Sequence, residues 1–347
     1  MTIEGLRVLV TGGTGSLGHR IVRRMLTGEL GRPAKVVVLS RDEAKQHHMR
    51  LSYLHRTAAT DEVIYENSRD LLSFRIGDVR DYATLAAAVR NVDLVVHAAA
   101  LKQVPTCEYF PNEAVQTNVL GAINLVRAIR ETGSAVQTVV CISTDKACKP
   151  INVMGMTKAL MERVMVEANL ERSETRFIGV RYGNVVASRG SVVPLFLDQI
   201  AAGGPITITL KEMTRFLLSL DGAVDTVFDA LAHAAPGEIY VPRLPAARVV
   251  DVARVLANGR DIPIVFTGIR PGEKIHEIMV SEEECHRTTA RERYFVIAPS
   301  LPELRKLATA PPLTAEYSSS DVTLDEAGLR DLLAPYMAGY TFEDVPA

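Results

Sequence analysis

The chain has 347 residues, 47% of them hydrophobic, so it can bury the core of one large domain or of two closely packed ones. Its formal net charge of −2 excludes a strong bulk attraction to nucleic acid or to an anionic membrane, and neither is expected as a partner. The four cysteines show no C-x-x-C or Cys/His spacing, which indicates reduced thiols and no metal site. Without a secretory signal or an apolar run of spanning length, the sequence predicts a cytoplasmic protein.

The first half of the chain alternates short apolar runs with longer helical patterns. We expect buried parallel strands at residues 7–10, 35–39, 94–97 and 138–142. Helices are expected at residues 18–26, 82–89, 114–130 and 153–168, with Asp81 capping the second and Gly133 ending the third. This alternation predicts an α/β fold, a doubly wound parallel sheet of the Rossmann type with helices on both faces.

After Tyr182 the elements become shorter and are separated by clusters of glycine and proline. We expect a second, smaller α/β lobe for the substrate, built from residues 185–216 and 243–347. The segment from Leu217 to Val241 reads as a helix followed by a strand and would return to the first sheet. The Rossmann-type domain would therefore comprise residues 1–184 and 217–242.

A glycine-rich turn joins the first strand to the first helix. Its glycines permit a tight turn and a close approach of the backbone to a pyrophosphate, while the helix N-terminus presents free N–H groups to the anion. A plain strand–helix turn is the alternative, but this position at the start of the chain favours a dinucleotide site. The residues expected to bind the cofactor here are Thr11, Gly12, Thr14, Gly15, Ser16, Leu17 and Gly18.

The second strand ends at Ser40-Arg41, where an NAD site usually places an acid for the ribose 2′-hydroxyl. A serine and an arginine suit a 2′-phosphate, so the sequence predicts NADP, with NAD as the alternative. Arg41 could instead pair with Asp42, which follows it directly.

The stretch Thr144-Asp145-Lys146 follows the strand expected at 138–142, and a second lysine, Lys158, lies within the next helix. An acid beside a base at the carboxyl end of a strand is typical of proton-transfer chemistry. A surface Asp–Lys pair in a loop is the alternative, and such a pair would contribute little.

The glycine-rich turn resembles the TGxxGxxG signature of extended short-chain dehydrogenases/reductases. Within that superfamily the chain is similar to nucleotide-sugar 4,6-dehydratases, and residues 150–155 (PINVMG) are most similar to the UDP-N-acetylglucosamine 4,6-dehydratases that invert C5. Those enzymes make precursors of bacterial polysaccharides and related glycans. The resemblance covers residues 5 to about 280, and 293–297 (RYFVI) and 317–319 (YSS) in the tail are also familiar. The segments that carry it are 77–81 (GDVRD), 97–105 (HAAALKQVP), 143–147 (STDKA), 181–185 (RYGNV), 213–216 (MTRF) and 270–274 (RPGEK).

The resemblance implies a role for each matching residue. Lys158 would hydrogen-bond the nicotinamide ribose, Thr144 would contact the C4 oxygen of the sugar, and Lys102 would approach the sugar or its diphosphate. Two arginines near a diphosphate make physical sense, because a guanidinium matches phosphate oxygens. Asp78, Val79, Ala98, Ala99 and Ala100 would line the cofactor, and Asn184, Arg215, Arg270 and Glu273 would bind the UDP moiety of a UDP-N-acetylhexosamine.

The implied reaction is an internal redox elimination. NADP+ oxidises C4 of the sugar, water is eliminated across C5 and C6, and the hydride returns to C6. We expect Lys146 to remove the C5 proton and Asp145 to protonate the leaving hydroxyl. A lysine can act as a base only if burial or a cationic neighbour lowers its pKa, and Lys158 is the neighbour expected to do so.

Met154 departs from the pattern of the resembled enzymes, most of which carry a tyrosine there that takes the C4 hydroxyl proton. Methionine can neither give nor take a proton, although its thioether can pack against the sugar or nicotinamide. Either Lys146 or Asp145 would then act a second time as the C4 base, or a relay through Lys158 and the ribose would carry the proton.

Other functions remain open at the level of the sequence. A UDP-sugar 4-epimerase needs hydride removal and return at C4 but no elimination pair, and a UDP-sugar 5,6-dehydratase would stop at the unsaturated sugar. A non-catalytic NADP-binding module is a further alternative. The resembled enzymes commonly form homo-oligomers, and the long segment 45–72 is expected to cover a neighbour's cofactor site.

Overall fold

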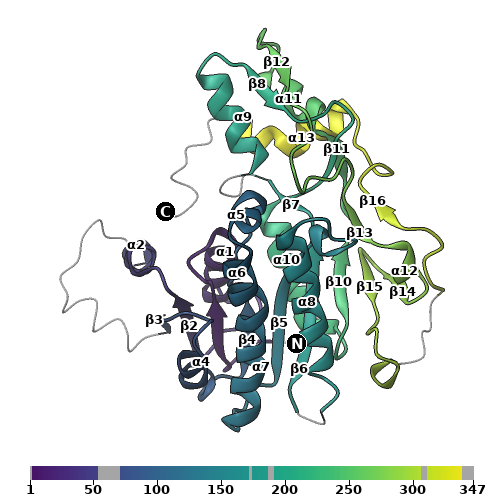
Figure 1. Cartoon of the computed structure of the whole chain (residues 1–347). Coiled ribbons are helices and arrows are strands. Elements are labelled where there is room, and N and C mark those ends of the chain that lie inside the picture. The colour runs from purple at the N-terminus through teal and green to yellow at the C-terminus, as the bar shows by residue number, and fades with distance from the viewer. Residues whose placement is uncertain (1, 54–70, 172–173, 187–190, 306–310, 338–347) are drawn as a thin grey trace.

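A nine-stranded sheet forms the body of the protein (Figure 1). The computed structural model describes residues 2–53, 71–171, 174–186, 191–305 and 311–337, and the account below concerns these residues. The strand order is β14-β15-β10-β6-β5-β4-β1-β2-β3. The sheet crosses over between β4 and β1, and ligands of open α/β sheets bind outside the carboxyl ends of the strands at such a switch point.

Seven of these strands run parallel, as expected for apolar runs rich in β-branched residues. The four strands expected from the sequence are present. One has the expected bounds, and the other three run one or two residues further at the carboxyl end. The parallel strands are β1 (Arg7–Thr11), β2 (Lys35–Ser40), β3 (Leu72–Ile76), β4 (Leu94–His97), β5 (Thr138–Thr144), β6 (Arg176–Tyr182) and β10 (Ile239–Pro242).

Helices cover both faces of the sheet. The helices α4 (Tyr82–Val89), α7 (Gly121–Glu131) and α8 (Val153–Glu167) bury apolar residues in one core, whereas α1 (Ser16–Leu26) and α10 (Leu220–His233) contribute to the core on the opposite face. The doubly wound, Rossmann-type fold is therefore confirmed. The helix expected at 114–130 is present in three parts, α6 (Pro111–Ala114), a π-helical stretch η1 (Val115–Leu120) and α7.

The predicted helix ends have the expected chemistry. The carboxylate of Asp81 accepts hydrogen bonds from the backbone N–H groups of Ala83 and Thr84, so it caps α4 as predicted. Gly133 has a φ of +59° just after α7, a conformation that glycine adopts without a steric cost. Two short helices follow β2 and β4, namely α2 (Glu43–Tyr53) and α5 (Val104–Tyr109).

Two strands lie elsewhere than the sequence indicated. The hairpin β14 (Thr288–Arg291) and β15 (Tyr294–Ile297) falls in the range 243–347 assigned to the smaller lobe, but it extends the large sheet. The strand β15 pairs antiparallel with β10, which follows α10 and returns to the sheet as expected. An antiparallel edge needs no helical crossover, so the βα alternation used to assign strands could not indicate it.

The second lobe lies beyond the carboxyl ends of the parallel strands (Figure 1). Its core packs α9 (Val192–Ala201), α11 (Val249–Ala257) and α13 (Glu326–Met337) against short strands. The strands form three small sheets: β11 (Ala246–Arg248), β9 (Thr214–Leu218) and β7 (Asn184–Val185); β12 (Ile264–Phe266) and β8 (Ile206–Ile208); and β13 (Ile278–Val280) with β16 (Tyr317–Ser318).

All four cysteines lie among the described residues, where each is buried and none forms a disulfide. Within the same residues, we find no helix whose length and apolarity would let it cross a membrane.

A buried ion cluster ties the carboxyl end of β6 to α8 and to the segment before β14. The guanidinium of Arg181 on β6 lies 2.6 Å from a carboxylate oxygen of Glu162 on α8 and 2.7 Å from one of Glu284 on α12 (Glu282–Cys285). Burial raises the pKa of Glu284, but the nearby arginine more than offsets this and lowers it to about 2. Glu284 is therefore charged at neutral pH, and the Arg181 guanidinium compensates the burial of the carboxyl groups on both sides of it.

Replacing Arg181 with leucine should leave the buried carboxylate of Glu162 without its cation and that of Glu284 with Arg287 alone, 3.2 Å away. We expect the free energy of unfolding at pH 7 to fall by about 3–5 kcal/mol, the usual cost of breaking a buried ion pair from one side. Urea denaturation measures this loss. Arg254→Leu is the control, because 60% of the Arg254 side chain is exposed and its pair with Asp251 should contribute little. Equal stability of the two variants would contradict the assignment.

Candidate active site

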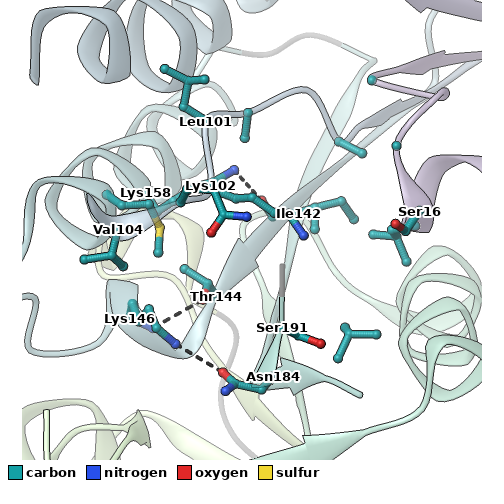
Figure 2. Close-up of a pocket in the computed structure, with 18 of the residues that line it drawn as sticks. Ser16, Leu101, Lys102, Val104, Ile142, Thr144, Lys146, Lys158, Asn184 and Ser191 are labelled. Atoms are coloured by element: carbon teal, nitrogen blue, oxygen red, sulfur yellow. Dashed lines mark hydrogen bonds between the residues drawn. The ribbon is translucent and has the colours of Figure 1, made fainter. Parts of the chain in front are cut away.

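One cavity of about 860 Å³ lies over the carboxyl ends of the parallel strands, between the sheet and the second lobe. A volume of this size is in the range expected for a site that binds a small molecule or cofactor. Figure 2 shows side chains from both parts of the chain converging on it, among them Ser16, Lys102, Thr144 and Asn184. The cavity therefore brings the glycine-rich turn and the Asp–Lys turn to one site.

The glycine-rich turn forms one wall. At Gly12, φ is +68° and an added Cβ would lie 2.7 Å from the backbone nitrogen of Ala99. A Cβ at Gly18 would lie 2.6 Å from the carbonyl oxygen of Gly12. The turn and the start of α1 therefore present bare backbone to the cavity, which fits the pyrophosphate of a dinucleotide.

The predicted cofactor residues line this wall with one exception. Gly12, Thr14, Gly15, Ser16, Leu17, Gly18, Asp78, Val79, Ala98, Ala99 and Ala100 all border the cavity. Thr11 instead lies behind it, fully buried, with its hydroxyl 2.9 Å from Nδ1 of His97. The same hydroxyl accepts a hydrogen bond from Ala99 N, so Thr11 positions the 98–100 loop.

The far end of this wall is polar and partly exposed. The hydroxyls of Ser40 and Thr14 lie 2.8 Å apart, and both residues border the cavity. Arg41 does not pair with Asp42, whose carboxylate lies 3.1 Å from the ammonium of Lys45 instead. The carboxylate nearest to the guanidinium of Arg41 is that of Asp78, at 3.8 Å. More than half of the Arg41 side chain is exposed beside the cavity, so it is available to a ligand phosphate.

The Asp–Lys pair occupies a single 3₁₀ turn, η2 (Asp145–Ala147), at the carboxyl end of β5. The Lys146 ammonium donates to Asn184 Oδ1 at 3.2 Å (Figure 2). It also donates to Asp145 Oδ1 at 3.0 Å and lies 3.2 Å from Oε1 of Glu277. Thr144 donates its hydroxyl proton to the same oxygen of Asp145, at 2.8 Å. Asp145 itself is 0% exposed and does not border the cavity, whereas Thr144 and Lys146 do.

The surroundings of Lys146 differ from those expected. Burial alone lowers the pKa of Lys146, but the carboxylates of Asp145 and Glu277 outweigh it, so the pKa is raised. The cation that opposes them is Arg215, not Lys158 as the sequence suggested. The resting site therefore holds Lys146 as an ammonium.

Lys158 is the group whose proton is loosely held. Its ammonium is buried and donates to the carbonyl of Ile142 at 2.8 Å (Figure 2). Burial lowers its pKa to about 8, because no carboxylate lies close enough to compensate the charge fully. One turn earlier, Met154 borders the cavity and packs against Cys107 and Ala114.

Close packing fixes the turn against α8. A Cβ at Gly155 would lie 2.2 Å from the carbonyl oxygen of Lys146, so only glycine fits between the helix and the turn. Asn152 caps the helix by accepting from Gly155 N and donates to the carbonyl of Gly272, both at 2.7 Å. The 270–274 loop of the second lobe is thus attached to the start of α8.

The residues expected to bind the nucleotide border the same cavity: Lys102, Asn184, Arg215, Arg270 and Glu273. The guanidinium of Arg215 is held by the carbonyls of Thr214, Ile275 and Lys274, at 2.7, 3.2 and 3.0 Å. Arg270 is exposed at the rim. One basic group is therefore fixed inside the cavity and another lies at its edge, an arrangement suited to a diphosphate.

Three residues that the sequence did not indicate belong to the site. Glu277 and Tyr182 border the cavity, and Asn118 holds the loop after β4 by bonding both N–H and C=O of Leu101. Tyr182 belongs to the segment 181–185 (RYGNV), in which the resemblance implies a role for Asn184 but none for the tyrosine. Asn118 lies inside a helical pattern that gives no local signal. Glu277 stands three residues after the RPGEK segment, and only its contact with Lys146 identifies it.

Comparisons with known proteins agree with this geometry. The family model described as "Polysaccharide biosynthesis protein" matches residues 8–299. A UDP-N-acetylglucosamine 4,6-dehydratase (inverting) of Campylobacter jejuni is 41% identical over 86% of this chain and 84% of its own length. A UDP-glucose 4-epimerase of Rickettsia akari is 43% identical over 84% of this chain and 82% of its own.

Solved structures share the fold. Pen from Bacillus thuringiensis superposes with a TM-score of 0.84 at 32% identity, over 97% of this chain and 99% of that one. The dTDP-glucose 4,6-dehydratase DesIV of Streptomyces venezuelae, solved with NAD and TYD bound, gives a TM-score of 0.64 at 24% identity, over 78% and 87%.

The fold and the cavity define a protein of the extended short-chain dehydrogenase/reductase type. The chain belongs to the polysaccharide biosynthesis protein family, and within it to the group of nucleotide-sugar dehydratases and epimerases.

Gly155→Ala should disturb the Asp–Lys turn directly. The new Cβ would meet the Lys146 carbonyl at 2.2 Å, so α8 or the turn must shift. We expect a loss of about 1–3 kcal/mol in the free energy of unfolding, as for other overpacked sites, together with a lower turnover. Met156→Ala, on the same helix and half exposed, is the control. A G155A protein as stable and active as M156A would show that the contact relaxes freely.

Proposed function

We propose that the protein is an inverting UDP-N-acetylglucosamine 4,6-dehydratase that uses NADP in the synthesis of a bacterial polysaccharide or glycan precursor. The observation that carries this proposal is the Lys146 ammonium at the cavity wall, between the carboxylates of Asp145 and Glu277. Water elimination across C5 and C6 needs an acid–base group beside those carbons, whereas epimerisation at C4 does not.

The hydrogen bonds of the turn suggest how the pair works. Lys146 would pass its ammonium proton to Asp145, 3.0 Å away, and the resulting amine would take the proton from C5. Asp145, now protonated, would return its proton through the Thr144 hydroxyl to the oxygen leaving C6, which departs as water. Lys146 ends as an ammonium and Asp145 as a carboxylate, so the pair returns to its resting state.

Lys158 is our choice for the C4 hydroxyl proton in the absence of a tyrosine at 154. Its pKa of about 8 allows it to exchange a proton near neutral pH, which Met154 cannot do. Met154 is 4% exposed and packs at the cavity wall, where it excludes water.

The cradle of Gly12 and Gly18 fits a nicotinamide dinucleotide, which when bound supplies the hydride transfer. The exposed guanidinium of Arg41 beside Ser40 supports NADP over NAD. We further propose that the enzyme is cytoplasmic and forms homo-oligomers. Residues 54–70, the centre of the segment expected to cover a neighbour's cofactor site, lie outside the described residues.

A UDP-sugar 4-epimerase is the second candidate, because relatives that are 43% identical carry the name UDP-glucose 4-epimerase. Incubation with UDP-N-acetylglucosamine in D2O, followed by NMR, distinguishes the two. Loss of one water with deuterium at C5 supports the dehydratase, and a C4 epimer supports the epimerase. An unsaturated sugar would indicate a 5,6-dehydratase, and no conversion with cofactor bound would indicate a non-catalytic module.

Lys146→Ala should abolish deuterium incorporation at C5, because Lys146 is the amine that lies between the carboxylates of Asp145 and Glu277. The other lysines that border the described part of the cavity, Lys45, Lys102 and Lys158, lie on other elements, namely α2, the loop after β4 and α8. Lys149→Ala is the matched control: this lysine is three residues away, partly exposed and paired with Glu316 at 2.7 Å. C5 exchange that survives in K146A at the K149A rate would refute the assigned role.

Arg41→Ala should weaken NADP binding selectively. Losing a charge-assisted hydrogen bond to a 2′-phosphate costs about 1.5–3 kcal/mol, or roughly 10- to 100-fold in Kd, while NAD binding should hardly change. Fluorescence titration with each dinucleotide measures the ratio. Arg90→Ala, an exposed arginine away from the cavity, is the control. A proportional loss for both cofactors would contradict the NADP assignment.

A further inference from the structure

We propose that Glu277 is a positioning residue of the proton-transfer centre: it holds the Lys146 amine at the cavity wall and sets the pH at which that amine changes its protonation state. This inference rests on the proposed dehydratase function and adds to it a residue from the second lobe. Four observations carry it, namely the geometry of the carboxylate, its backbone anchor, the charges around Lys146 and the origin of each charge.

The carboxylate of Glu277 is buried yet faces the reaction site. The residue is 1% exposed, and its Oε1 lies 3.2 Å from Lys146 Nζ and 3.8 Å from Arg215 Nε. Its other oxygen, Oε2, finds no hydrogen-bond partner among the described residues, although the residue borders the cavity. A buried carboxylate oxygen left in this state is costly unless a ligand or water satisfies it.

The backbone of Glu277 is clamped by Ser319, which is completely buried. The Glu277 N–H donates to the Ser319 hydroxyl at 2.9 Å, and the Ser319 N–H donates to the Glu277 carbonyl at 2.8 Å. The Ser319 hydroxyl also lies 2.6 Å from that of Thr214, which precedes Arg215 on β9. Ser319 thus fixes the backbone that carries the Glu277 carboxylate against β9 of the same lobe. It belongs to the segment 317–319 (YSS), for which the resemblance implied no role.

The charges that face Lys146 come from several elements. Asp145 belongs to the same turn, Glu277 precedes β13, Arg215 lies on β9, and Lys274 of the 270–274 loop also interacts with the pair. Asn184 contributes only a neutral oxygen. Two carboxylates thus face Lys146 against two cations, and burial of the site strengthens each interaction.

Asp145 and Glu277 differ in what holds them. Asp145 is adjacent to Lys146 in the chain and moves with it, and its second oxygen has no partner in the described structure either. Glu277 belongs to the second lobe and is fixed independently by Ser319. The distance from Glu277 to Lys146 is therefore set by how the lobes meet, so this carboxylate fixes the amine relative to the substrate-facing wall.

The test compares Glu277→Gln with Glu277→Asp, using Glu316→Gln as the control. Glu316 also pairs with a lysine, Lys149, but outside the cavity. In the proposed mechanism the amine form of Lys146 removes the C5 proton after its own proton has passed either to Asp145 or to solvent. The solvent route opens as the pH rises, so the rate of C5 exchange rises with pH through the pKa of Lys146. Removing the Glu277 charge lowers that pKa, so in E277Q the acid limb should move to lower pH by about one unit or more.

E277D keeps the charge but shortens the side chain, so its acid limb should stay in place while the plateau kcat falls severalfold at unchanged KM. E316Q should leave both unchanged. Ser319→Ala should reproduce the E277D pattern, since it loosens the carboxylate without removing it. An acid limb that stays in place in E277Q, or moves equally in E316Q, overturns the inference.

Direct titration of Lys146 separates this inference from the proposed function. The ¹⁵Nζ or ¹³Cε NMR signal of Lys146, assigned by its loss in K146A, reports the pKa without any turnover. A lower pKa in E277Q supports the inference even in a protein that converts no UDP-sugar, a result that would remove only the dehydratase assignment. An unchanged pKa refutes it whatever the activity. Should E277Q fail to fold, the kcat of E277D and of S319A decides, since a kcat equal to that of E316Q in both variants overturns the proposal.

Discussion

The arrangement of the site depends on the buried charge of Arg181. Its guanidinium joins β6 to α8 through Glu162 and to α12 through Glu284. Ser143, just before the Asp–Lys turn, donates to Glu162 at 2.5 Å, and the Cys148 thiol, just after it, contacts Glu284. The two ends of the turn are thus attached to one ion cluster. Because removal of Arg181 would leave the buried carboxylate of Glu162 without its cation, the turn is attached to an ion cluster that is expensive to break at its centre.

The turn is held in addition by a steric constraint and by the meeting of two lobes. Gly155 allows α8 to touch the Lys146 carbonyl, while the second lobe contributes Glu277 and Arg215 to the charges around the Lys146 amine. The Rossmann-type sheet therefore supplies the lysine and its adjacent acid, and the smaller lobe supplies the charges that balance them. The proposed proton transfer would therefore depend on the contact between these parts, because the cavity lies between them.

Local patterns in the sequence were sufficient for the four parallel strands expected at residues 7–10, 35–39, 94–97 and 138–142, the helix cap at Asp81 and the glycine-rich turn, because each is decided by neighbouring residues. The Asp145–Lys146 pair could also be recognised, because the two residues are adjacent in the sequence. What could not be predicted depends on contacts across the chain. The edge hairpin of β14 and β15 has no crossover helix, and Asp145 lies behind the cavity wall. Beside Asp145, the second carboxylate that faces Lys146 belongs to a glutamate 131 residues further along the chain.

The Ser319 clamp has a consequence for the order in which the enzyme becomes competent during its synthesis. The cofactor wall is complete once β1 to β6 have been made, but Glu277 is fixed only when residue 319 has left the ribosome. A nascent chain that ends before residue 319 would therefore carry a formed glycine-rich turn and a Glu277 without its backbone anchor. Because Ser319 directly follows β16, the proposed arrangement around Lys146 is complete only after that strand has been synthesised.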